Sequence, residues 1–165
     1  MLFRSTGIAA SVVMMSPQYK IPVSVLVVIH SADLQVLLLE RADKPGFWQS
    51  VTGSRDPDET DLANTARREV MEETGLDAAA FELRDWRKQN QYEIYPQWRA
   101  RYGPGVTHNT EHVFGLCLPE PCPVILAPRE HLRYEWLPWR DAADKVFSWS
   151  NAEAIRELPS RAANR

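Results

Sequence analysis

The chain has 165 residues, of which 44% are apolar and 25% are charged, and its formal net charge is −3 at pH 7. These values are ordinary for one soluble globular domain with a substantial hydrophobic core. The small negative charge and the dispersed basic residues exclude an electrostatic case for binding nucleic acid or an anionic membrane. A polyanionic substrate would therefore need a metal ion to approach. Composition leaves the oligomeric state open.

The first residues contain an apolar run, Gly7 to Met15, which is too short to span a bilayer and has no convincing cleavage site for export. We therefore expect residues 1–18 to be a disordered extension, unless translation starts at Met14 or Met15, and residues 19–160 to form a single domain. Cys117 and Cys122 flank a Pro-Glu-Pro turn without the partner spacing of a metal site, so we interpret them as small hydrophobic residues. These features fit a reducing cytoplasm.

The first part of the domain predicts three strands. Val23–Ile29 is a continuous apolar run rich in β-branched residues, typical of a central strand covered on both faces. Val36–Glu40 follows after a turn, and Phe47–Thr52 leads into an acidic stretch. Strands that feed a helix across a long loop indicate an α/β fold, with a mixed sheet between helices.

The acidic stretch, Gly53 to Leu76, predicts an exposed loop that leads into a helix. Its turn-forming residues come first, and Asp58 or Thr60 is a candidate N-cap. Gly75 should end the helix as a C′ glycine. An apolar stripe with a period of four residues should face the core, and it consists of Leu62, Ala66 and Val70.

Three glutamates, Glu69, Glu72 and Glu73, gather on another face near the end of this helix. Their charges repel one another and the negative end of the helix dipole. One interpretation is a solvated face offset by Arg67 and Arg68. The other is a metal site, because crowded carboxylate oxygens suit hard cations such as Mg²⁺ or Mn²⁺. The acidic loop before the helix favours the metal site.

A second set of strands should follow the helix. Alternating residues predict one or two strands over Phe81–Tyr95. A basic, glycine-containing loop is expected over Arg99–Asn109. Three further strands are expected at Glu111–Leu118, Val124–Leu126 and Tyr134–Leu137.

Two helical segments should close the domain. Pro138 is placed to open the first of them. The second should be capped by Ser150 or Asn151 and should end near Leu158.

Residues Arg68–Leu76 read R-E-V-M-E-E-T-G-L and resemble the end of the Nudix box, G-x5-E-x7-R-E-U-x-E-E-x-G-U with U aliphatic. Gly53 and Glu59 keep the spacing of its front half, but eight residues rather than seven separate Glu59 from Arg68. An insertion inside a helix would rotate the carboxylates by about 100°. We therefore expect the extra residue in the loop and do not transfer the family role to Glu59. The resemblance implies a Nudix-type α/β/α sandwich.

Segments outside the box resemble the bacterial dihydroneopterin triphosphate diphosphatases of folate biosynthesis, among them Phe47–Ser54, Asn109–Glu111 and Ser148–Asn151. This resemblance implies metal ligation by Glu69, Glu73 and Glu130. It also implies substrate contacts by Lys20, Arg41, Thr52, Tyr92, Glu93, Ile94, Tyr95 and Ser148.

Each transferred residue has a structural alternative. Lys20 and Arg41 could be surface cations, and Glu130 could be a solvated acid. Thr52 could fill a strand, and the tyrosines could belong to the core of an edge strand. The histidines lack the spacing of a metal motif, so we interpret them as structural or surface residues; they are His108, His112 and His131.

The reaction implied by the resemblance is hydrolysis of dihydroneopterin triphosphate to the monophosphate and pyrophosphate. Glu72 or Glu130 would orient or deprotonate the attacking water, and Arg68 would hold Glu72 at i, i+4. A Nudix hydrolase of nucleoside triphosphates or other nucleoside diphosphate derivatives is an alternative. A catalytically silent ligand sensor is another, which the three repelling acids disfavour.

Overall fold

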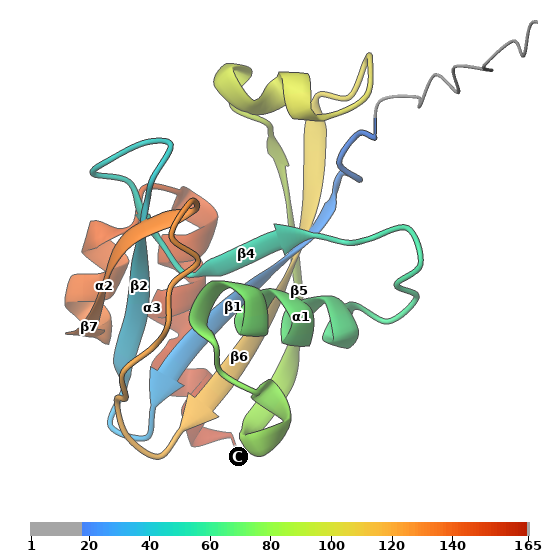
Figure 1. Cartoon of the computed structure of the whole chain (residues 1–165). Helices are drawn as coiled ribbons and strands as arrows, with labels where there is room; N and C mark the ends of the chain where they lie inside the picture. The colour runs from blue at the N-terminus through green and yellow to red at the C-terminus, as the bar shows by residue number, and fades with distance from the viewer. Residues whose placement is uncertain (1–17, 165) are drawn as a thin grey trace, which may run out of the picture.

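The computed structural model describes residues 18–164, so the expected extension over residues 1–18 lies outside the described residues except for Gln18. Its centre is a 7-stranded sheet with the order β3-β2-β1-β6-β5, in which β4 also pairs with β1 and β7 with β2 (Figure 1). The pair β1–β6 is parallel and the other pairs are antiparallel. The strands are β1 Val23–Ser31, β2 Gln35–Arg41, β3 Trp48–Gln49, β4 Val51–Ser54, β5 Glu82–Glu93, β6 His108–Leu118 and β7 His131–Pro138.

Both faces of the central strands are covered, as the apolar run in β1 predicted. Alternate residues of β1 enter two different clusters: Val27 packs on the side of helix α1 (Leu62–Thr74), and Val28 packs on the opposite side. The second side is covered by helices α2 (Trp139–Lys145) and α3 (Trp149–Ala163). Figure 1 shows this arrangement, with the green α1 on one side of the sheet and the orange and red helices on the other. The predicted α/β/α sandwich is confirmed.

The prediction of a strand at Val124–Leu126 is wrong. This segment has no regular secondary structure, and the amide of Ile125 instead donates to the carbonyl of Thr74 at 2.9 Å. Closely spaced prolines remove the amide donors that a sheet partner would need; they are Pro119, Pro121, Pro123 and Pro128.

The limits of other strands differ from those expected from the sequence, because a strand extends as far as a neighbouring strand can pair with it. Phe81–Tyr95 holds one strand, β5, whose register shifts between Asp85 and Lys88. Its pairing with β6 extends to Glu93 and His108, so β6 begins before the predicted Glu111. A short 3-10 helix, Pro96–Arg101, occupies part of the predicted basic loop.

Two predicted N-caps are wrong. Asp61, not Asp58 or Thr60, caps α1, and its carboxylate accepts the amide of Ala63 at 2.9 Å. Ser148, not Ser150 or Asn151, caps α3. In both places neighbouring residues have cap-forming side chains, and the backbone path selects one of them.

The other helix limits agree better with the sequence. Gly75 ends α1 with φ 72, as predicted, and α2 begins directly after Pro138. Helix α3 continues beyond Leu158, through Pro159, to Ala163. No helix within residues 18–164 has the length and apolar character needed to cross a membrane.

Candidate active site

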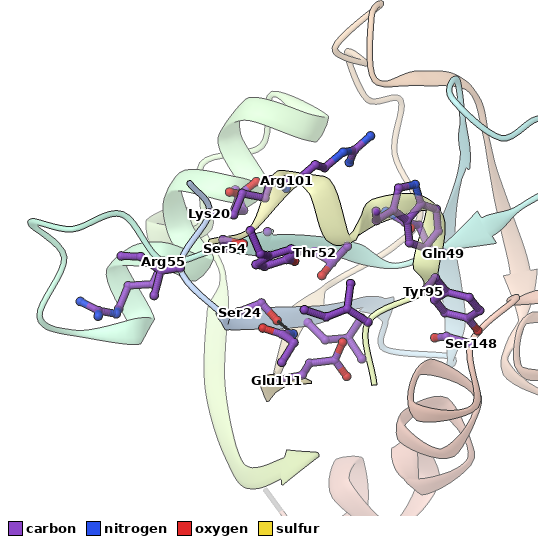
Figure 2. Close-up of a pocket in the computed structure, with 18 of the residues that line it drawn as sticks. Lys20, Ser24, Gln49, Thr52, Ser54, Arg55, Tyr95, Arg101, Glu111 and Ser148 are labelled. Atoms are coloured by element: carbon purple, nitrogen blue, oxygen red, sulfur yellow. Dashed lines mark hydrogen bonds between the residues drawn. The ribbon is translucent and has the colours of Figure 1, made fainter. Parts of the chain in front are cut away.

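A cleft of about 880 Å³ lies between α1, the 3-10 helix segment and the start of α3. Figure 2 shows its polar lining, with Lys20, Thr52 and Ser54 on one side and Ser24 and Glu111 below them. The cleft brings together all but one of the residues that the sequence singled out. They are Lys20, Arg41, Thr52, Glu69, Glu72, Glu73, Tyr92, Glu93, Ile94, Tyr95, Glu130 and Ser148. Arg68 does not line it.

Strand β4 allows the glutamates of α1 to approach the sheet. A β-carbon at Gly53 would lie 2.0 Å from the Cδ atom of Glu69, so only glycine leaves room for this carboxylate. One turn later, Glu73 accepts the amide of Thr52 at 3.3 Å. Glu69 and Glu73 are only 8% and 5% exposed to solvent. The local sequence therefore buries two carboxylates at one wall of the cleft.

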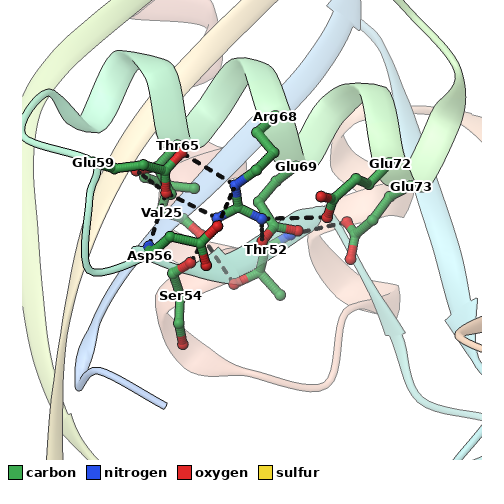
Figure 3. Close-up of polar contacts among 10 residues, drawn as sticks. All are labelled: Val25, Thr52, Ser54, Asp56, Glu59, Thr65, Arg68, Glu69, Glu72 and Glu73. Carbon is green, nitrogen blue, oxygen red and sulfur yellow. Dashed lines mark hydrogen bonds and ion pairs between the residues drawn. The ribbon is translucent and has the colours of Figure 1, made fainter. Parts of the chain in front are cut away.

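Arg68 lies behind these glutamates and holds the loop to the helix (Figure 3). Its Nη2 and Nε donate to Oε1 and Oε2 of Glu59 at 3.0 and 3.1 Å. Its Nη1 donates to Glu69 at 2.8 Å and to Glu72 at 3.3 Å. The pKa of Glu59 is lowered chiefly by Arg68. Contact with Glu72 agrees with the sequence, whereas the central role of Glu59 was missed because its spacing is irregular.

The extra residue lies where the sequence predicted it. Helix α1 is continuous from Leu62, so Thr60 and Asp61 belong to the loop. Glu59 still reaches α1, accepting a hydrogen bond from Thr65 Oγ1 at 3.1 Å. The longer loop thus preserves the orientation of the glutamates that follow.

The protein neutralises only part of the negative charge that it buries on α1, through the ion pair of Arg68 with Glu69. Burial raises the pKa of Glu69 to about 7 despite the adjacent Arg68. Burial also raises the pKa of Glu73 well above its ordinary value, and the charges of Glu69 and Glu130 add to this effect. Carboxylates with raised pKa values in a cleft are stabilised in their charged form by a nearby cation.

The group of side chains best suited to hold a cation includes a histidine that the sequence interpretation set aside. Ligand atoms of Glu73, Glu130 and His131 lie within 4.8 Å of one another. His131 is buried, its Nδ1 has no hydrogen-bond partner, and burial lowers its pKa to about 4. Glu69 adjoins this group without belonging to it. Only the context Glu130-His131 could have signalled this histidine.

Cationic side chains stand opposite the glutamates. Arg41 forms a bidentate pair with Asp43 at 2.8 and 2.7 Å, and the same aspartate contacts Arg101 at 3.0 Å. Arg41 thereby lowers the pKa of Asp43 to about 2. Partial burial, together with the charge of Arg101, lowers the pKa of Lys20. This side of the cleft can accept an anionic group.

An aromatic wall, defined here as Phe47, Tyr95, Trp98 and Phe147, lies near the start of α3; the last three residues line the cleft, and Phe47 supports Phe147. Phe47 stacks on Phe147 with ring centroids 4.8 Å apart, and Tyr95 meets Trp98 edge-on at 5.3 Å. Arg41 lies 4.5 Å above the ring of Trp98. The wall offers flat apolar surfaces suited to a planar ring. Only Tyr95 was assigned to the site from the sequence.

The bottom of the cleft carries a second set of residues, of which the sequence interpretation assigned only one to the site. We call it the polar floor, and it comprises Ser24 on β1, Asn90 and Tyr92 on β5, and Asn109 and Glu111 on β6. Asn109 Nδ2 donates to Ser24 Oγ at 2.7 Å and to the Tyr92 hydroxyl at 3.0 Å. Only Tyr92 was expected at the site; the others look like ordinary strand residues in sequence.

The sequence matches the NUDIX domain family over residues 20–158. It is 46% identical to the dihydroneopterin triphosphate diphosphatase of Escherichia coli K12 over 148 residues, which cover 88% of this chain and 97% of the relative. The enzyme of the same name from Haemophilus influenzae is 43% identical, with coverage of 85% and 89%. The structure matches that of the E. coli dihydroneopterin triphosphate pyrophosphohydrolase with a TM-score of 0.81 and 45% identity, over 89% of this chain and 99% of the other.

Proposed function

The chain belongs to the Nudix family, and we propose that it hydrolyses dihydroneopterin triphosphate to dihydroneopterin monophosphate and pyrophosphate. Both curated relatives described above carry that activity in their names and are related along most of their length. The reaction would serve folate biosynthesis, with a small-molecule triphosphate as partner and the cytoplasm as location.

One observation in the structure supports this proposal most directly. The same cleft joins buried acidic side chains at one wall, including Glu69 and Glu73, to flat aromatic surfaces at another, including Tyr95. A triphosphate carrying a planar bicyclic ring needs both. A silent sensor would have no use for buried carboxylates whose charge the protein compensates only in part.

The acidic wall fits the divalent metal ion that Nudix hydrolases generally need. Hard carboxylate oxygens from Glu69, Glu73 and Glu130 would hold Mg²⁺, or alternatively Mn²⁺, with His131 as a neighbouring nitrogen. When bound, the ion supplies charge neutralisation for the phosphates and for the departing pyrophosphate.

The protein's own residues would then position the reactants. Lys20 and Arg41 bind phosphate oxygens, because both cations line the cleft. Glu72 and Glu130 are exposed carboxylates that line the cleft, and one of them would orient or deprotonate the water. Arg68 acts behind the cleft as a positioning residue that fixes Glu72 and Glu69.

The test of function compares kcat/KM for dihydroneopterin triphosphate with values for the common nucleoside triphosphates, while pyrophosphate and orthophosphate are measured separately. We expect a preference for the pterin of about 10- to 200-fold over deoxyguanosine triphosphate, which shares part of its hydrogen-bonding edge. Activity should disappear with a chelator and return with Mg²⁺. A tenfold preference for a nucleotide, or orthophosphate as the first product, would leave only the general Nudix assignment.

A further inference from the structure

The polar floor forms because three adjacent strands present polar residues on the same sheet face. Glu111 lies opposite Asn90 across the antiparallel β5–β6 pair and opposite Ser24 across the parallel β1–β6 pair. Residues directly opposite in a sheet project to the same side. Tyr92 and Asn109 repeat this arrangement at the neighbouring position. The polar side chains therefore converge on the cleft from a rigid base.

Several polar atoms of this floor are buried without a hydrogen-bond partner. They include Oε1 of Glu111, Oδ1 of Asn109 and Nδ2 of Asn90. Glu111 and Asn109 are only 4% and 1% exposed. Burying such atoms without a partner costs folding free energy, and the cost is greater for a charged group. Two of them, in Glu111 and Asn109, belong to residues that line the cleft.

The unpartnered atoms of the two residues that line the cleft, Oε1 of Glu111 and Oδ1 of Asn109, are both hydrogen-bond acceptors. A planar ring edge that presents several donors could satisfy such acceptors. The 2-amino group and the adjoining ring N–H of a 2-amino-4-oxopyrimidine form such an edge. A carboxylate accepts two parallel hydrogen bonds from it.

We infer that Glu111 recognises the 2-amino-4-oxopyrimidine edge of the substrate ring, with Asn109 as an adjacent acceptor. This inference rests on the proposed function and adds the specificity determinant. Dihydropterin and guanine both carry this edge, whereas adenine, cytosine and hypoxanthine do not. The aromatic wall would then hold the ring, while the triphosphate reaches the acidic wall formed by α1.

The electrostatics of Glu111 agree with this role. Burial raises its pKa, and the polar side chains of Ser150, Asn90 and Tyr92 oppose the rise. No cationic side chain contributes to this balance. Donors from a ligand would add to the stabilisation that these polar side chains give the carboxylate.

The first experiment needs no variant, because deoxyguanosine and deoxyinosine triphosphates differ only in the 2-amino group. Wild-type enzyme should hydrolyse the guanosine compound with a kcat/KM about tenfold or more above that of the inosine compound. Equal values would overturn the inference even if every variant failed to fold.

The second experiment uses Glu111→Gln. This substitution preserves side-chain size but replaces one acceptor oxygen with an NH2 group, which would face the N–H donors of the ligand. We expect kcat/KM for dihydroneopterin triphosphate and deoxyguanosine triphosphate to fall about 10²-fold. Deoxyinosine triphosphate should be affected far less. Glu82→Gln is the matched control, because Glu82 lies on β5, exposed and outside the cleft.

Binding of neopterin, which has the ring without phosphates, provides a readout independent of catalysis. Calorimetry with chelator present should detect binding to the wild-type protein and a loss of about tenfold or more in the variant. An equal loss of activity on all substrates, or no change in neopterin binding by a folded variant, would contradict the inference. If nucleotides outperform the pterin while discrimination by the 2-amino group persists, the proposed function fails and the recognition of this edge stands.

Discussion

The carboxyl carbon of Glu69 lies 2.0 Å from the position that a β-carbon on residue 53 would occupy. We expect Gly53→Ala to displace this carboxylate and lower kcat by about 10²-fold, because small displacements in a catalytic group are costly. The fold should survive, since the displaced atoms belong to a side chain. Gly103→Ala is the control, because its new β-carbon would make ordinary contacts from 3.7 Å. Activity and melting temperature would be measured for both, and unchanged turnover in Gly53→Ala would contradict this reading.

Replacing either buried glutamate of α1 should separate activity from stability. Glu69→Gln and Glu73→Gln are each expected to lower kcat by about 10²-fold or more, or roughly 2.7 kcal/mol of transition-state stabilisation. Their folded states should be as stable as the wild type or more so, because the raised pKa values mark charges that burial disfavours. Steady-state kinetics at saturating Mg²⁺ and thermal melts test both parts. Wild-type turnover in either variant would exclude that residue from metal binding.

The metal-free protein should lose stability as the pH rises. The folded-state pKa of Glu69, about 7, lies above its ordinary value of 4.5, so the folded state binds more protons between these values. The associated stability is fully present below pH 4.5 and is lost as the pH passes 7, amounting to roughly 1 to 3 kcal/mol. Urea unfolding with chelator should show this loss in the wild type and a smaller one in Glu69→Gln. Parallel curves for the two proteins would rule out Glu69 as the source.

The N-cap of α1, Asp61, and the loop that precedes it should affect the stability of the protein but not its activity. Asp61→Ala should cost about 1 kcal/mol, because it removes the acceptor for the Ala63 amide, while Thr60→Ala should cost little. Deleting Thr60 should be tolerated better than deleting Asn64, because the latter shifts the helix start against its apolar stripe. Melting temperatures of the four proteins test this, and equal losses for the two deletions would count against it.

The parts of the fold that the sequence revealed are those encoded locally. The apolar run of β1 and the glycine that ends α1 each carry their signal within a few residues. The N-caps were misplaced because Asp58, Thr60 and Asp61 are all suitable by residue type, and only the backbone path distinguishes them.

The residues of the candidate site also fall into those that the local sequence predicts and those that only the fold brings together. The glutamates of α1 could be predicted because helical spacing gathers them on one face. The polar floor could not, because Ser24, Asn109 and Glu111 meet through strand register rather than sequence proximity. Likewise, the place of His131 beside Glu73 depends on where β7 runs.

The hydrogen bond between Asn109 and Ser24 joins residues 85 positions apart, which sets when the cleft can appear during synthesis. Strand β1 leaves the ribosome early, but its parallel partner β6 ends only at Leu118. Strand pairings between residues so far apart in sequence form slowly. Until β6 has been synthesised, the apolar edge of β1 is unpaired and favours aggregation. A nascent chain that stops before β6 would therefore contain every residue of the glutamate helix but would lack Asn109 and Glu111 of the polar floor.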